Sequence, residues 1–426
     1  MSITLQDQPR DLTQKKQKLI YFGIGTNLVQ VNYKYGVTVD VIGGSNALKY
    51  YVPPNPSTYM VFDLAPAVRD RVTLDVEDAQ SGGVIHNIPH TEDDFMSVGT
   101  NGCKQFQVFF FEVYGDPISE QATTAFDFPF LLSGGFNIRD GFKPDMSDYE
   151  PTASTKKAFL TERVRINGEI RIKASESDYG TLSFINDDGT YFNSDATRLR
   201  YKIYNSLGVQ GTEVFTIGTA YGSQLPIATT AAGKLTYFGA YPANVNSENH
   251  AVSSGFKPED IANWTYITWE LLDDSLNAVS EPIYIDNTAN PCKHESVHLA
   301  WGNKLGAWDY WRFDARKKNK VNTQRKLYQK SAGDYSDTSF SMPAFSRQSK
   351  AYHVESTLEY EIESEALTYE ESDYIKNVMS SENVMMYIGG QWLPVNVTNN
   401  SLSFQTEPIS KRITTKLSVE LAQKEC

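Results

Sequence analysis

Cysteine is scarce in this sequence. Its 426 residues include three cysteines, Cys103, Cys292 and Cys426, which lie far apart along the chain. A small disulfide-linked domain and a four-cysteine zinc site both need more cysteines at closer spacing. The sequence therefore excludes both kinds of scaffold.

Long apolar runs are also missing. No run approaches the roughly 18 apolar residues of a membrane-spanning helix, and residues 1–18 lack the apolar centre of a secretory signal. We therefore expect a protein that is synthesised in the cytosol, with no membrane span and no membrane partner.

Positive charge is in deficit. The 39 lysines and arginines are outnumbered by 52 aspartates and glutamates, which gives a net charge of −13 at pH 7. Proteins that coat nucleic acid neutralise its phosphates with an excess of positive charge. We therefore expect no sequence-specific nucleic-acid partner, and any contact with nucleic acid would be local.

Aromatic and β-branched residues, by contrast, are abundant. Phe, Trp and Tyr make up 12% of the chain, which favours half-buried β-sheet surfaces. Between Arg163 and Ile172 apolar side chains recur at every second position, as in a strand with one solvated face. Similar patterns predict further strands over residues 28–42, 106–113, 199–203, 266–271, 283–285, 297–301, 308–313 and 413–421.

One segment has a clear helical pattern. Thr368 and Glu371 have the spacing of a capping box, in which the two side chains satisfy free backbone N–H groups at a helix start. Apolar residues then follow at helical spacing, namely Tyr374, Ile375, Val378 and Met379. The pattern predicts a helix over about residues 368–380.

The length favours several domains, and two polar stretches mark their boundaries, residues 134–155 and 286–293. We predict a mostly β chain of tandem antiparallel β-sandwich domains, of the immunoglobulin or fibronectin kind, with a C-terminal β-rich module that carries the helix. The predicted parts are a polar N-terminal arm (1–14), a β-sandwich (15–135), a linker (136–155), a second β-sandwich (156–290) and the C-terminal module (291–426).

The sharpest catalytic motif is His294-Glu295-Ser296-Val297-His298. On a helix the two histidines would lie one turn apart and share a zinc ion, with Glu295 as the general base of a metallopeptidase. The alternation of Val297, Leu299 and Trp301 instead predicts a strand, which separates the histidines by roughly 13 Å. We therefore expect no metal, no cofactor and no enzymatic activity, with the zinc metallopeptidase as an alternative.

Positive charge is concentrated between residues 312 and 330. This patch either docks on an acidic neighbour or is a solvated strand whose lysines protect a sheet edge from aggregation. A protein partner is favoured over DNA. The patch comprises Arg312, Arg316, Lys317, Lys318, Lys320, Arg325, Lys326 and Lys330, and the candidate interface residues are Arg316, Lys317, Lys318, Lys320, Arg325 and Lys326.

Three segments carry a resemblance to known proteins. They are Asn55-Pro56 with Phe62-Asp63-Leu64-Ala65-Pro66, Val68 and Val72; Trp301-Gly302-Asn303-Lys304-Leu305-Gly306-Ala307-Trp308-Asp309-Tyr310 with Phe313; and Glu370-Glu371, residues 384–388, Gly389-Gly390-Gln391-Trp392-Leu393-Pro394-Val395 and Val419-Glu420-Leu421. In these segments the sequence resembles virion proteins of tailed bacteriophages that infect Bacteroidetes, including crAss-like phages.

The resemblance implies a non-enzymatic structural component of the tail, neck ring or baseplate. Such a protein resides in the virion and assembles in multiple copies around the particle axis. Its partners are then other copies of itself and neighbouring virion proteins. A carbohydrate-binding adhesin is a further alternative, because exposed aromatic rings stack on sugars.

Overall fold

The computed structural model of the chain describes residues 3–78, 82–89, 95–135, 146–153, 157–186, 194–217, 235–246, 256–288, 295–329, 333–344, 347–399, 405–406 and 413–423. Residue contacts divide the chain into two compact units. Unit 1 comprises Met1–Ala289, Ala300–Arg312 and Asp373–Asn383, and unit 2 comprises Asn290–Leu299, Phe313–Ser372 and Val384–Cys426.

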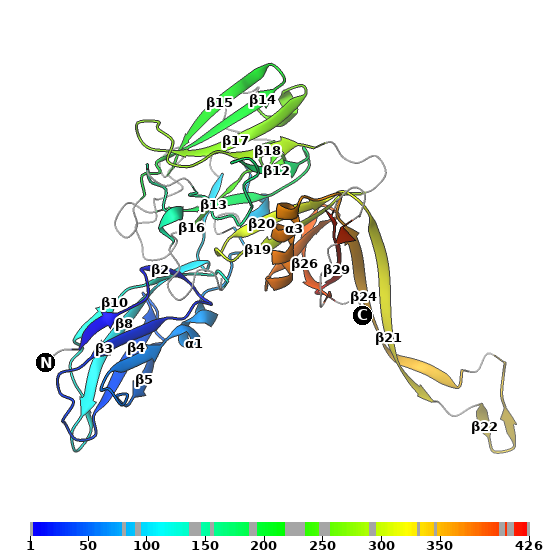
Figure 1. The fold of residues 1–426 in the computed structure, drawn as a ribbon. Helices are drawn as coiled ribbons and strands as arrows, with labels where there is room; N and C mark the ends of the chain where they lie inside the picture. Colours follow the sequence, from blue (N-terminus) through cyan, green and yellow to red (C-terminus); the bar gives the residue numbers. More distant parts are fainter. Residues whose placement is uncertain are drawn as a thin grey trace. The chain divides into compact units, whose positions relative to one another are not determined.

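Unit 1 begins with two sheets that share one apolar core (Figure 1). Tyr21, Tyr35 and Phe110 are fully buried between them. The three-stranded sheet has the order β1 (Thr4–Asp7), β3 (Ile20–Ile24), β6 (Met60–Asp63). The larger sheet has the order β2 (Leu12–Gln14), β11 (Phe130–Leu132), β8 (Cys103–Tyr114), β4 (Lys34–Val41), β5 (Leu48–Val52), and β9 (Ser119–Glu120) and β10 (Ala125–Asp127) also pair with β8.

A second pair of sheets in unit 1 packs around Trp269. Its indole Nε1 donates to the Ala240 carbonyl oxygen at 2.8 Å, and its ring lies 5.1 Å from that of Phe238. One sheet has the order β12 (Ile170–Ala174), β18 (Ile283–Asn287), β17 (Trp264–Leu272), β14 (Arg198–Asn205), β15 (Gly208–Thr216), and the other has the order β13 (Thr181–Ile185), β16 (Leu235–Gly239), β7 (Met96–Val98).

Unit 2 is built on antiparallel strands, and its buried side chains include Ile362, Trp392 and Val419. The strands follow the order β25 (Val384–Ile388), β26 (Gln391–Val397), β29 (Lys416–Leu421), β24 (Ser349–Glu363), β21 (Lys317–Gln329). Two short strand pairs are β22 (Asp334–Ser336) with β23 (Ser339–Ser341), and β27 (Gln405–Thr406) with β28 (Ile413–Thr414). The chain passes between the units through β19 (Val297–Gly302) and β20 (Trp308–Phe313).

Helices are short throughout the described residues. They are α1 (Ala65–Val68), η1 (Arg69–Arg71), η2 (Ile85–Asn87), η4 (Ser147–Tyr149), α2 (Pro242–Val245), η5 (Pro258–Asp260), α3 (Tyr369–Ile375) and η6 (Lys376–Ser380). The capping box predicted at the start of α3 is confirmed: the Thr368 N–H donates to Glu371 Oε2 at 2.8 Å, and the Glu371 N–H donates to Thr368 Oγ1 at 3.1 Å. Within the described residues, no helix has the length and apolar character needed to cross a membrane.

The mostly β fold class is confirmed, and most predicted strands are present. The single strand predicted over residues 163–172 is wrong. Asn167 and Gly168 have positive φ angles of 54° and 88°, and Ile166 and Glu169 exchange backbone hydrogen bonds across them. Asn-Gly is the preferred pair for such a tight turn, so the chain reverses there and β12 begins after it. The strand predicted from residue 28 likewise begins later, at Lys34.

The polar N-terminal arm predicted over residues 1–14 is also corrected. β1 pairs with β3, and β2 pairs in parallel with β11. Ile3 and Leu12 are buried, and the residues of β2 are buried as well. The apolar residues in this polar segment are few, but Ile3 and Leu12 are buried and Leu5 packs against the core, so the segment belongs to unit 1.

Unit 1 also departs from the predicted domain limits. β7, from within the predicted 15–135 sandwich, pairs with β16 of the predicted 156–290 sandwich. Residues Ala300–Arg312 of the predicted C-terminal module group with unit 1 as well. Buried contacts explain this grouping, because Trp308 Nε1 donates to the Asp75 carbonyl oxygen at 2.6 Å and His86 Nδ1 lies 2.7 Å from the Tyr310 hydroxyl.

One carboxyl group lies in the second pair of sheets without a polar partner. Glu213 of β15 stands opposite Tyr201 of β14, and its side chain is buried. Among the described residues neither of its carboxylate oxygens has a hydrogen-bond partner. Burial disfavours the charged form and raises the pKa of Glu213 to about 7.

We expect the substitution Glu213→Gln to flatten the pH dependence of stability. Because the native pKa of Glu213 is raised, the chain has its full free energy of unfolding when this group is protonated in both states, below the ordinary pKa of 4.5. Part of that free energy is lost as the pH rises through about 7. The loss amounts to about 3 kcal/mol, at 1.4 kcal/mol per pKa unit. Urea unfolding at pH 5 and pH 8.5 measures it.

The matched control is Glu370→Gln, because Glu370 is exposed. The control should keep the pH dependence of the wild-type chain. If Glu213→Gln and the control gave the same difference in unfolding free energy between the two pH values, Glu213 would not be the group responsible.

Candidate functional site

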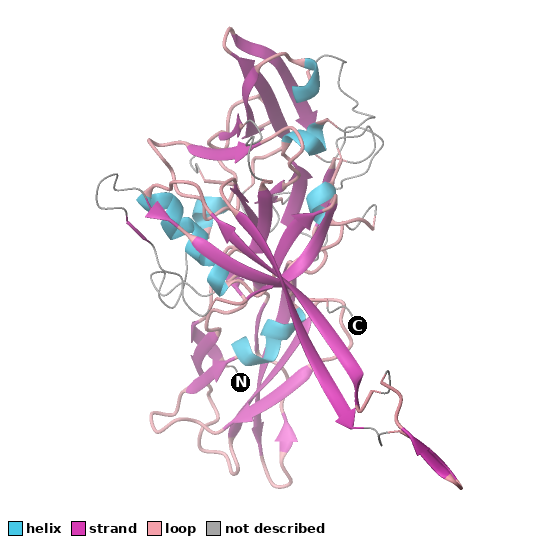
Figure 2. Cartoon of the chain, turned by 90° about the vertical axis from the view of Figure 1, so that its right-hand side faces the viewer, coloured by secondary structure: helices cyan, strands magenta, loops and turns pink. Residues whose placement is uncertain are grey.

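The predicted basic patch lies on a long hairpin formed by β21 and β24. The two strands pair antiparallel from Lys317 and Ile362 to Gln329 and Ser349. β29 pairs with β24 only over Glu359–Glu363. Beyond the pair Lys320–Glu359, the hairpin therefore continues as a two-stranded ribbon (Figures 1 and 2). We call residues 321–358 the arm.

The arm has no core of its own. Among its described residues with assigned exposure, none is buried. Its large apolar side chains are exposed instead, including Val321 at 61%, Leu327 at 61% and Tyr352 at 65%. An isolated two-stranded ribbon is marginal in water, and clustered exposed apolar residues mark sites of interaction. The arm therefore has the character of a surface that another molecule covers.

The two faces of the arm differ in composition. Residues directly opposite each other on antiparallel strands share a face. Val321 pairs with Leu358, and Val354 and Leu327 follow on the same side. These four residues define the apolar face, which continues the side of the sheet that buries Tyr360 and Ile362 in unit 2.

The opposite face is the polar face of the arm. Lys320 stands opposite Glu359 and Lys326 stands opposite His353. A bulge between Lys326 and Leu327 places the rings of Tyr328 and Tyr352 6.3 Å apart. Arg325 stands opposite Val354 and so lies among the apolar side chains of the arm, whereas Lys326 lies on the polar face.

Several of the predicted interface lysines have partners within their own unit. Lys317 Nζ lies 2.7 Å from Glu295, Lys318 Nζ lies 3.3 Å from Glu361, and Lys320 Nζ lies 2.9 Å from Glu359. Hydrogen bonds from Lys320 and Asn322 lower the pKa of Glu359. Exposed pairs of this kind contribute at most about 1 kcal/mol each.

The remaining basic residues of the patch differ in their surroundings. Arg312 is buried in unit 1 and pairs with Asp178 at 2.7 Å, so it does not belong to a surface patch. Arg316 and Lys318 line an open cavity of about 300 Å³ on unit 2. Arg325 and Lys326 form no ion pair with another described residue, and Lys330 lies outside the described residues. Arg325 and Lys326 are therefore cations of the arm that no described acidic side chain neutralises.

The zinc interpretation of residues 294–298 does not agree with the local structure. Val297 and His298 begin β19, so the strand prediction is confirmed and the helical one is wrong. His298 is buried with its ring 5.4 Å from that of Trp392, and Glu295 pairs with Lys317. His294 lies outside the described residues. Within the described part of the chain, no group of three or more His, Cys, Asp or Glu side chains is arranged for a metal.

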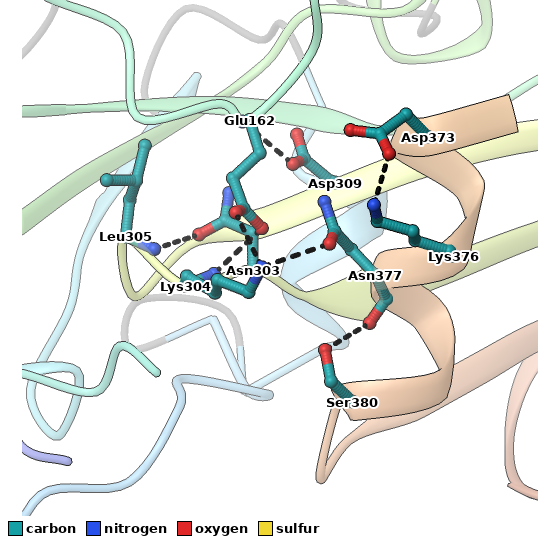
Figure 3. Close-up of polar contacts among 9 residues, drawn as sticks. All are labelled: Glu162, Asn303, Lys304, Leu305, Asp309, Asp373, Lys376, Asn377 and Ser380. Atoms are coloured by element: carbon teal, nitrogen blue, oxygen red, sulfur yellow. Dashed lines mark hydrogen bonds and ion pairs between the residues drawn. The ribbon is translucent and has the colours of Figure 1, made fainter. Parts of the chain in front are cut away.

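The turn between β19 and β20 carries the second resembling segment and borders a small polar pocket in unit 1 (Figure 3). Asn303 closes the turn: its Oδ1 accepts from the N–H groups of Leu305 and Ala307 at 3.0 Å, and its Nδ2 donates to the Leu160 carbonyl oxygen at 2.9 Å. The positive φ of Gly306, 91°, completes the reversal. The side chain of Asn303 therefore stabilises the turn, which explains why an asparagine occupies this position.

Lys304 and Glu162 line the same pocket. The Lys304 N–H donates to Glu162 Oε2 at 3.0 Å, and Lys304 Nζ donates to Asn377 Oδ1 at 3.1 Å (Figure 3). Burial, assisted by the nearby charge of Asp309, raises the pKa of Glu162 to about 6. The cavity of about 30 Å³ has room for about one water molecule. The pocket is therefore a site of polar packing between the β19–β20 turn and η6.

We expect Asn303→Ala to destabilise unit 1 by about 2–3 kcal/mol, since it leaves one buried carbonyl and two N–H groups without their partner. Thermal unfolding measures the loss. The control is Asn319→Ala on the exposed strand β21, which should change stability by less than about 0.5 kcal/mol. Equal effects of the two substitutions would contradict the role given to Asn303.

Sequence reasoning missed an exposed aromatic cluster on the outer side of the first large sheet. Phe126 is 64% exposed, its ring lies 5.6 Å from that of Phe128, and Phe128 packs edge-on against Phe109. Nearby, Lys49 and the Tyr51 hydroxyl both donate to Glu120. The alternation of β8 indicated a strand but did not indicate which of its faces is solvated.

No protein-family model matches the chain, and no curated protein matches it. Two solved structures are similar in part. The FN1–FN3 domains of chicken CNTN1 show 11% identity over 67% of each chain with a TM-score of 0.18. CBD12 from CALX1.2 shows 8% identity over 68% of this chain and 100% of that chain, with a TM-score of 0.20. The fold is mostly β. At these scores neither likeness carries an argument about function.

Proposed function

We propose that the chain is a non-enzymatic structural protein of a tailed-phage virion, in the tail, neck ring or baseplate. It assembles in multiple copies with itself and with neighbouring virion proteins. The observation that carries this proposal is the arm, a ribbon with exposed apolar residues and with the cations Arg325 and Lys326, which form no ion pair with a described residue. The resemblance of the three sequence segments supports the same class of protein.

The arm supports an assembly role for a physical reason. Because no described residue of the ribbon is fully buried in its own chain, the ribbon gains stability when a second molecule covers it. Among the described strands β21 is the last one of its sheet, so its outer edge offers backbone groups for pairing. Such an edge can accept a further strand from a partner.

Mass spectrometry of purified particles tests the proposal. We expect peptides of this chain among the structural proteins, at several copies per particle. Particles that retain infectivity but contain no copy of the chain would overturn the proposal.

The exposed aromatic cluster favours a second candidate function, the binding of glycans. Phe126 and Phe128 present rings to solvent, and Glu120 and Lys49 provide polar groups nearby. Binding of the chain to an array of glycans, lost in Phe126→Ser and retained in the exposed control Leu207→Ser, would support this candidate. No binding to any glycan on the array would remove it.

A further inference from the structure

The charge of the arm is opposite to that of the rest of the chain. Residues 321–358 contain five basic and three acidic residues, whereas the other residues contain 34 basic and 49 acidic ones. Within the arm, its two long strands carry the cations Arg325, Lys326 and Lys350 and one acid, Glu355. The arm is therefore a cationic element on a strongly acidic chain.

We propose that the arm binds the acidic body of a second copy of the same chain, so that copies associate head to tail. The proposal rests on the proposed function, since it names the partner of the surface that carries it. Charge complementarity favours the body of another copy as the partner. Association of arm with arm would instead place positive groups against positive groups.

The apolar face supplies the hydrophobic interaction in this contact. Val321, Leu327, Val354 and Leu358 continue the buried side of the unit 2 sheet onto the exposed ribbon. The residues from Val321 to Gln329 span about 26 Å at 3.3 Å per residue. That length is sufficient for the ribbon to lie across a neighbouring domain and to cover the apolar face against it.

Head-to-tail contact has a consequence for symmetry. Each copy then uses two different surfaces, an arm and an acceptor, and such contacts close into rings or continue as filaments. An arm-to-arm contact would instead stop at a symmetric dimer. In the head-to-tail arrangement a chain without an arm can still bind the arm of another copy. In the arm-to-arm arrangement it cannot bind at all.

Co-expression of two chains distinguishes them. One is the full-length chain, and the other is a tagged arm-deleted chain in which Asn-Gly replaces residues 321–358. We expect the full-length chain to co-purify with the tagged chain as short capped oligomers, because the arm-deleted chain still offers its acceptor. A full-length chain that self-associates but never co-purifies with the tagged chain would overturn head-to-tail contact.

A charge variant of the full-length chain tests the same contact without deletion. The triple substitution Arg325→Glu, Lys326→Glu and Lys350→Glu should reduce co-purification at least tenfold at 0.1 M salt or below, where the Debye length is about 10 Å or more. The matched control reverses three exposed cations of unit 1, Lys18, Lys34 and Arg69, and should not reduce it. Equal losses in both triple variants would overturn the role of the arm charges.

A full-length chain that remains monomeric at all concentrations would overturn the second copy as the partner. That result would not decide the proposed virion function, which mass spectrometry of the particles tests separately. Failure of the head-to-tail proposal and failure of the proposed function are therefore distinguishable.

Discussion

Replacing residues 321–358 by Asn-Gly leaves a folded chain that no longer self-associates; this is the largest effect we expect. The deletion removes no described side chain that is buried, and the Lys320–Glu359 pair remains to close the shortened hairpin. Asn-Gly favours the tight turn that joins the two strands. Sedimentation velocity measures the association, and circular dichroism with thermal unfolding measures the fold.

A gentler variant controls for the deletion. Val321→Ser, Leu327→Ser and Val354→Ser keep the length of the arm but make its apolar face polar, and we expect association to weaken strongly. The matched control changes three exposed apolar residues of unit 1 to serine, namely Val29, Leu207 and Leu276. Oligomers that survive the arm deletion unchanged would contradict the assembly role of the arm.

The second large effect is expected from Arg312→Met in unit 1. Arg312 Nη1 lies 2.7 Å from Asp178 Oδ2, with side-chain exposures of 1% and 11%. Removal of one member of a buried ion pair leaves a buried charge without compensation, at a cost of about 3–5 kcal/mol. Urea unfolding of the single variant measures this loss.

The double variant Arg312→Met with Asp178→Asn separates the charge from the packing. Because it removes both charges, we expect it to recover much of the stability lost in the single variant. Arg316→Met is the exposed control and should change stability by less than about 0.5 kcal/mol. A double variant as unstable as Arg312→Met alone would show that the ion pair is not the cause.

Local patterns in the sequence were sufficient to predict most of the elements. The aromatic residues over 308–313 predicted β20 with its observed limits, because aromatic side chains favour β-strands. The Thr368–Glu371 capping box predicted the start of α3, because both hydrogen bonds involve residues three positions apart. Interactions of short range can be inferred without knowledge of the fold.

Pairing between distant segments could not be predicted. β7 is a strand of three residues whose partner, β16, begins more than a hundred residues later. Arg312 has the same side chain as the exposed Arg316, and only the position of Asp178 makes it a core residue. The Asn167-Gly168 turn was missed for a different reason, since the apolar alternation continues through it and obscures the turn signal.

The candidate site was predicted in part. The density of basic residues between 312 and 330 indicated an unusual strand, and the structure places most of that stretch on β21. Sequence alone did not show that Lys317, Lys318 and Lys320 have acidic neighbours in their own unit. The length of β24 and the exposure of the apolar face depend on where β29 ends, which is a property of the folded sheet.

Cross-linking of assembled chains tests the central claim most directly. Equal amounts of chain with natural and heavy nitrogen are co-assembled and treated with a lysine cross-linker, so that links between copies contain both isotopes. We predict that Lys326 and Lys350 of one copy link to lysines outside residues 321–358 of another copy. Links between copies that join arm only to arm, or that never include the arm, would contradict the account.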